Sequence, residues 1–164
     1  MPAVTLTPVT TATRPVLERL WQLYVHDLSE FRDSRPDDQG LFKAGRLPAY
    51  VDGDDDSGAF LVHADGELAG FVLLRGLLRE PRTIGEFFVL RGLRRRGVGH
   101  EVAVTVLRER PGSWEIAFQE ENPGAAVFWR RVASDVAGEA WHEERRPVPG
   151  KPHIPPDVWL MLQT

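Results

Sequence analysis

The chain has 164 residues, of which 42% are hydrophobic and 27% are charged. This balance is typical of soluble globular proteins and excludes a fibrous or disordered chain. The length predicts one domain over residues 1–164. With a net charge of −4, a broad nucleic-acid-binding surface is not expected, and the absence of cysteine excludes disulfides, thiolate metal sites and an acyl-cysteine intermediate.

No stretch of the sequence predicts a membrane anchor or a secretion signal. The longest apolar run covers residues 68–74, whereas a membrane-spanning helix needs roughly 20 apolar residues. Residues 1–16 have neither a basic leader nor an apolar core. We therefore expect a cytoplasmic protein that does not associate with membranes.

The first third of the chain predicts a strand, a helix and an irregular segment. Residues 4–9 alternate threonine with apolar residues, as a short strand does. From Pro15 the apolar residues recur at helical spacing, with a stripe formed by Leu17, Leu20, Trp21, Tyr24, Val25 and Leu28. Residues 33–58 are rich in turn formers and acidic side chains, which indicates a mobile surface segment with one short helix near residues 41–50.

The remainder predicts strands with two helices between them. Asp65-Gly66 joins strands at 59–64 and 67–77 and is a strong hairpin signal. Residues 83–90 predict a central strand that is apolar on both faces except at Glu86. Further elements are expected as a helix at 97–110, a strand at 114–118, a helix after Asn122-Pro123, and closing strands at 140–146 and 158–163. This order predicts an α+β sheet with helices on its faces.

A glycine-containing turn follows the central strand. Arg94 to Gly99 spell RxxGxG between the strand EFFVL and the next helix. Glycine lets the backbone approach a ligand closely, and the free amides at a helix start favour an anionic phosphate. Four arginines within residues 91–96 would suit a pyrophosphate and one further phosphate. The alternative is an ordinary turn with a solvated arginine cluster, and neither a Walker loop nor a Rossmann GxGxxG is present.

Together with the strands and helices around it, this turn resembles the pattern of one protein family. EFFVLRGLRRRGVGHEVAVTVL, followed by WEIAFQEENPGAAVFWRRV, resembles the acetyl-CoA-binding half of the GNAT superfamily of N-acetyltransferases over roughly residues 83–132. The strand pair at 59–77 and the closing strands fit the same fold. The resemblance implies an acyl-CoA N-acyltransferase fold, a mostly antiparallel mixed sheet of about 6–7 strands with helices on both faces.

The resemblance also implies where acetyl-CoA would bind. The pantetheine arm would pair with the main chain of the central strand, the pyrophosphate would lie on the amides of residues 95–99, and His100 would begin the helix. Asn122 would lie near the end of the pantetheine, although an N-cap role alone also explains an asparagine before proline. The residues implied in cofactor binding are Phe88, Val89, Leu90, Arg94, Arg95, Arg96, Gly97, Val98, Gly99, His100, Asn122, Phe128 and Trp129.

The sequence departs from the family at Trp129. Many members have a tyrosine after the phenylalanine of this helix, and it protonates the departing thiolate. Indole cannot supply that proton, so another group or water does so, or the domain is not a catalyst.

Glu86 is the candidate base that would deprotonate the amine. We expect it to share a strand face with Ile84 and Phe88, where burial would raise its pKa. A structural hydrogen bond or salt bridge is the alternative role. No metal is expected, because Asp52, Asp54 and Asp56 imitate a calcium loop only in part and the histidines lack zinc-site spacing.

The predicted function is transfer of an acetyl group from acetyl-CoA to a primary amine by direct attack in a ternary complex. The acceptor would be a small molecule or a peptide. The alternative, motivated by Trp129, is a non-catalytic domain that binds or senses acyl-CoA. Exposed strand edges and the tryptophan-rich closing segments are also compatible with a homodimer.

Overall fold

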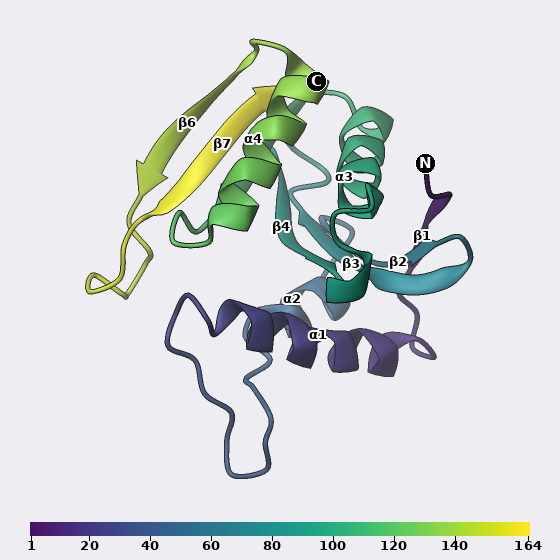
Figure 1. Cartoon of the computed structure of the whole chain (residues 1–164), viewed down its shortest axis with the longest axis vertical. Coiled ribbons are helices and arrows are strands. Elements are labelled where there is room, and N and C mark those ends of the chain that lie inside the picture. The colour runs from purple at the N-terminus through teal and green to yellow at the C-terminus, as the bar shows by residue number, and fades with distance from the viewer.

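A seven-stranded sheet organises the chain in the computed structural model, which describes residues 1–164 (Figure 1). Its strand order is β1-β2-β3-β4-β5-β7-β6, and only β4 and β5 are parallel neighbours. This confirms the predicted mostly antiparallel mixed sheet. The strands are β1 (Val4–Pro8), β2 (Ser57–Ala64), β3 (Glu67–Arg75), β4 (Arg82–Val89), β5 (Ser113–Phe118), β6 (Trp141–Arg146) and β7 (Asp157–Gln163).

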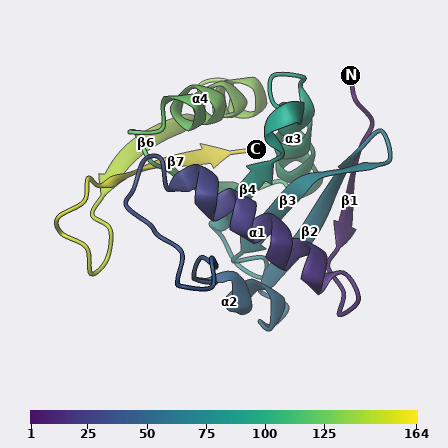
Figure 2. The ribbon, with the colours of Figure 1, turned by 60° about the horizontal axis from the view of Figure 1, so that its bottom comes forward.

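Helices cover both faces of the sheet. One face packs against α3 (Val98–Glu109) and α4 (Pro123–Ala137), and the other against α1 (Arg14–Leu28) and α2 (Leu47–Val51). Figure 2 shows α1 lying across the sheet. A short 3-10 helix, η1 (Arg91–Leu93), lies in the turn between β4 and α3. None of these helices has the length and apolar composition of a membrane span.

Two helix starts differ from the sequence-based expectation. The short helix expected at 41–50 is α2, which begins only at Leu47, with Pro48 in its first turn. Leu47 and Tyr50 are buried, so the segment also contributes to the core. Helix α3 begins at Val98, so His100 lies in its first turn and does not begin the helix.

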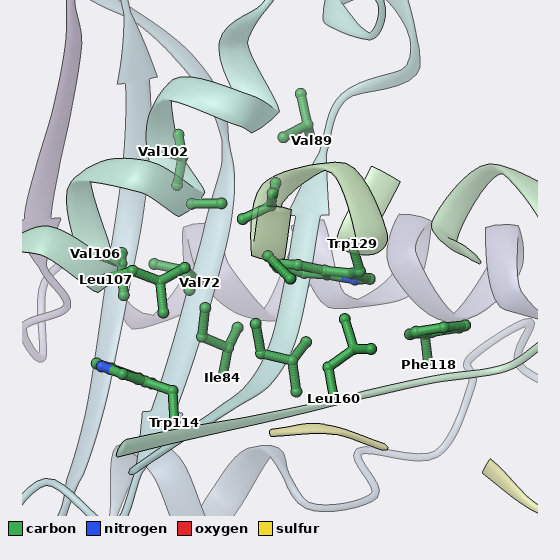
Figure 3. Packing of buried hydrophobic residues seen from close by; sticks show 14 of the residues in the cluster. Val72, Ile84, Val89, Val102, Val106, Leu107, Trp114, Phe118, Trp129 and Leu160 are labelled. Carbon is green, nitrogen blue, oxygen red and sulfur yellow. The ribbon is translucent and has the colours of Figure 1, made fainter. Parts of the chain in front are cut away.

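The two faces of the sheet have separate hydrophobic cores. Figure 3 shows the larger core, in which α3 and α4 pack on the sheet through residues such as Val102, Leu107 and Trp129. The smaller core lies under α1 and α2 and includes Trp21 and Phe71. Strand β4 contributes to both, because Val89 belongs to the larger core and Phe88 to the smaller. The prediction that this strand is covered on both sides is therefore confirmed.

An irregularity in β4 changes the face on which Glu86 lies. Leu73 of β3 pairs with Glu86 and Leu74 with Ile84, so Gly85 is an extra residue on β4. Ile84 consequently faces α3 and α4, whereas Glu86 lies opposite Leu73 and faces α1 and α2. The expectation that Glu86 shares a face with Ile84 was wrong, because the bulge interrupts the alternation; Glu86 does share a face with Phe88.

Strands β4 and β5 pair over only part of their length. Three residue pairs join them, the last being Ile84 with Ile116. Beyond this point, residues 85–89 of β4 have no partner on β5, while Ala117 and Phe118 continue to pair with β7. The sheet is therefore split beside the second half of β4, which is the strand half that carries Glu86.

Candidate functional site

The edge of β4 that faces the split has unpaired backbone groups. Leu90 donates its amide to the Ala69 carbonyl of β3 at 2.8 Å. Because hydrogen-bonded and non-bonded pairs alternate along an antiparallel ladder, Phe88 also bonds β3, whereas Phe87 and Val89 direct their N–H and C=O groups toward the split. Of the three main-chain positions expected to hold a pantetheine, only Val89 faces the split. Phe87, which the sequence analysis missed, faces it as well.

The turn after β4 presents a run of free amides at the start of α3. No amide from Arg95 to His100 donates a hydrogen bond within the protein, and the first helical bond runs from the Glu101 amide to the Gly97 carbonyl at 3.0 Å. Arg95 and Gly97 both have positive φ, 62° and 85°. Buried Val98 anchors the turn in the larger core. A helix N-terminus with free amides attracts an anion.

The arginines of this turn divide into two pairs. Arg91 and Arg94 both donate to the carboxylate of Asp27 in the last turn of α1, and Arg94 Nε donates to the Val89 carbonyl at 2.9 Å. Burial acts to raise the pKa of Asp27, but the two arginines outweigh it and the net pKa is lowered. Arg95 and Arg96 are exposed and form no ion pair. The pair that remains available to a phosphate is therefore Arg95 and Arg96.

His100 and Phe128 lie beside this turn, whereas Asn122 lies at the start of α4. His100 Nε2 lies 2.8 Å from Asp135 Oδ2 of α4. Asn122 caps α4, with its Oδ1 accepting from the Ala125 amide at 3.1 Å, while its side-chain NH₂ makes no hydrogen bond in the protein. Phe128 lies against Gly99: a Cβ at Gly99 would be 3.4 Å from the Phe128 ring.

Trp129 is a core residue. It is only 6% exposed, and its ring packs against Phe87 and Phe128 with centroids 5.0 and 4.8 Å away. Figure 3 shows the indole within the larger core. The position at which the resemblance would place an acid is therefore occupied here by a packing residue.

Glu86 meets a tyrosine from α1. The Tyr24 hydroxyl donates to Glu86 Oε2 at 2.5 Å, across 62 residues of sequence. Burial raises the pKa of Glu86, while the Tyr24 hydrogen bond and the charges of Arg75 and Arg46 oppose that rise. A carboxylate with a raised pKa beside an open strand edge is suited to accept a proton from an amine near neutral pH.

The aspartates that resemble a calcium loop have other partners. Asp52 binds Arg14, with 2.5 Å between Oδ1 and the guanidinium, and Asp56 pairs with Arg79 and accepts the Leu78 amide. No cluster of three or more potential metal-binding side chains occurs in the structure.

A sequence model of the acetyltransferase (GNAT) family matches residues 17–133. The chain belongs to the GNAT acetyltransferase family. No curated protein sequence matches this GNAT protein significantly.

Solved structures share the GNAT fold at low sequence identity. An acetyltransferase from Thermus thermophilus superposes with a TM-score of 0.71 at 17% identity, covering 99% of this chain and 97% of that one. An aminoglycoside acetyltransferase in complex with coenzyme A and kanamycin gives 0.65 at 14% identity, covering 98% and 95%. A spermidine N-acetyltransferase chimera from Vibrio cholerae and hSSAT gives 0.63 at 13% identity, covering 98% and 94%.

Proposed function

We propose that this GNAT protein transfers the acetyl group of acetyl-CoA to a primary amine by direct attack in a ternary complex, with Glu86 or a water it orders as the base. The observation that carries the proposal is the placement of Glu86 on the unpaired half of β4, directly before the turn with free amides. One strand would thus hold both the acyl donor and the base.

The residues present fit coenzyme A. The amides from Arg95 to His100, with Arg95 and Arg96, would bind the phosphates. The N–H and C=O of Phe87 and the N–H of Val89, which are free at the split, would hold the pantetheine, because its amide groups can pair as a strand does. Phe128 and the free NH₂ group of Asn122 would lie near its end. A bound acetyl-CoA would supply the activated thioester for transfer.

The transfer reaction needs a base more than it needs an acid. An alkyl ammonium has a pKa of about 10.4 and must lose a proton before attack, whereas a thiol has a pKa of about 8.5 and its thiolate leaves readily. Glu86, directly or through a water, would take the ammonium proton before attack. As the N–C bond forms and the C–S bond breaks, the nitrogen would release its second proton to solvent and the thiolate would take one from solvent. Because solvent can protonate the thiolate, the reaction needs no acid at position 129, where the tryptophan is a core residue. Holding the reactants together supplies much of the acceleration.

The aminoglycoside and spermidine acetyltransferases among the structural neighbours support an amine acceptor. We propose a small-molecule or peptide amine for this protein. A cytoplasmic location and homodimer formation remain predictions.

The test is turnover of acetyl-CoA with kanamycin, spermidine and short peptides, comparing wild type with Glu86→Gln. We expect Glu86→Gln to lower kcat at pH 7 by about 10²- to 10⁴-fold, because general base catalysis is lost, while coenzyme A affinity measured by calorimetry is unchanged. Glu139→Gln is the matched control, since Glu139 is exposed and has no ion-pair partner. Unchanged turnover in Glu86→Gln would remove Glu86 as the base. Binding of acetyl-CoA by wild type without turnover of any amine would favour the acyl-CoA-binding domain instead.

A further inference from the structure

The carboxylate of Glu86 has one committed oxygen and one free oxygen. Oε2 accepts the hydroxyl proton of Tyr24, and Oε1 makes no hydrogen bond within the protein. A half-buried carboxylate with a single donor is oriented by that donor, because the other oxygen has nothing to hold it.

Tyr24 is itself held by its ring and not by its hydroxyl. The ring packs against Trp21, Phe71 and Phe88, with centroid distances of 5.3, 5.4 and 6.0 Å, and the contacts with Phe71 and Phe88 are edge-on. Three aromatic contacts from a helix and two strands fix the position of the phenol. The hydroxyl is therefore a donor whose place does not depend on Glu86.

A second tyrosine packs against the backbone beneath the carboxylate. The buried Tyr50 hydroxyl has no hydrogen-bond partner and lies against the bulge, where a Cβ on Gly85 would be 1.9 Å from it. Burial and the nearby Glu86 charge raise the pKa of Tyr50 to about 12, so it stays neutral. The chain contains two tyrosines, and both are used around the bulge and Glu86.

We propose that Tyr24 is a positioning residue for Glu86. Its hydrogen bond holds Oε2, so that Oε1 is the oxygen left to take the proton of the attacking amine. The proposal rests on the proposed function for its effect on catalysis, and on the observed contact alone for its effect on the ionisation of Glu86.

The expected pH effect follows from the groups around the carboxylate. Tyr24 from α1, Tyr50 from α2, Arg46 before α2 and Arg75 of β3 are the titratable and charged groups that act on Glu86 or its bulge. Among them Tyr24 donates the hydrogen bond. In Tyr24→Phe the charged form of Glu86 loses this donor, so its pKa rises and the acid limb of the kcat/KM profile moves to higher pH.

The kinetic experiment compares wild type, Tyr24→Phe, Glu86→Gln and the double variant. Phenylalanine retains the ring contacts, so the fold should persist. We expect Tyr24→Phe to lower kcat at pH 7 on the order of tenfold, as loss of a hydrogen bond to a charged group would, with the acid limb shifted and coenzyme A affinity unchanged. In the Glu86→Gln background the same substitution should change kcat by less than about twofold. An unshifted acid limb, or an equal loss in both backgrounds, would overturn the proposal.

A spectroscopic experiment tests the contact without turnover. In Tyr50→Phe, incorporation of 3-fluorotyrosine labels Tyr24 alone, because the chain has no third tyrosine. We expect the ¹⁹F resonance to follow a titration that disappears when Glu86→Gln is added, and a resonance that ignores Glu86 would refute the contact. If wild type acetylates no amine but the titration is present, the proposed function fails while the Tyr24–Glu86 contact stands.

Discussion

Two glycines shape the site at the level of single residues. Gly85 occupies the bulge because no side chain fits beneath the Tyr50 hydroxyl, and the bulge turns Glu86 toward Tyr24. Gly97 has a φ of 85°, a left-handed conformation that side chains disfavour, at the N-cap of α3. Both glycines therefore set backbone conformations on which the candidate site depends.

Gly97 provides a direct test of the phosphate-binding turn. Alanine at a left-handed φ costs about 1–2 kcal/mol, so in Gly97→Ala we expect the turn to change conformation and the affinity for coenzyme A to fall by about tenfold or more. Gly150→Ala is the matched control, because Gly150 has a φ of 72° and open space around it. Calorimetry should show wild-type affinity in Gly150→Ala. Equal affinities in the two variants would show that the turn does not bind the phosphates.

At the level of elements, the hairpin turn and the strand periodicity were predictable from local sequence. Asp65 and Gly66 both have positive φ, 52° and 84°, as the predicted hairpin turn requires. The start of α2 at Leu47 was harder to predict, because a five-residue helix has little periodicity and depends on burial of Leu47 and Tyr50. Short elements are decided by tertiary packing more than by propensity.

Asn122 has two roles to separate, as the N-cap of α4 and as a donor to the pantetheine. Asn122→Ala should lower the free energy of unfolding by about 1 kcal/mol, because the Ala125 amide loses its partner. Asn122→Asp keeps an acceptor for the cap but lacks the NH₂ group, so we expect near-wild-type stability with weaker coenzyme A binding. Urea unfolding and calorimetry measure the two effects. Wild-type affinity for coenzyme A in Asn122→Asp would show that Asn122 acts only as the N-cap of α4.

At the level of the whole molecule, one arginine joins the parts of the chain on either side of the split. Arg32, just after α1, contacts Glu121 after β5 at 2.9 Å and Asp157 at the start of β7 at 2.8 Å. Its side chain is only 15% exposed. This contact ties the α1 layer to the β5–β7 side of the sheet, where β4 and β5 themselves no longer pair.

Arg32→Gln should therefore destabilise the fold by about 1–3 kcal/mol, because two partly buried carboxylates lose their counter-charge. Arg35→Gln is the control and should change stability by less than about 0.5 kcal/mol, since the Arg35–Asp33 pair is highly exposed. Urea unfolding measures both, and equal effects would contradict the prediction.

The same variant has a predictable pH dependence. Burial acts to raise the pKa of Glu121, but a backbone hydrogen bond and Arg32 outweigh it, and the net pKa is lowered. Because the pKa of Glu121 is lower in the folded than in the unfolded chain, its ionisation stabilises the fold at pH values above the unfolded pKa of about 4.3. This stabilisation is lost as the pH falls through the folded pKa. The stability difference between wild type and Arg32→Gln should therefore shrink in acid.

The sequence by itself determined the element order, the apolar faces and the glycine turn, because periodicity and turn chemistry are local properties. It also placed Glu86 on the central strand. Only the tertiary structure decided that Glu86 faces α1 and that Tyr24 donates to it. It also decided that the backbone of Phe87 faces the split, whereas that of Phe88 and of Leu90 pairs with β3. These features depend on the register between strands and on contacts across 62 residues, and one bulged residue reverses the face of every position after it.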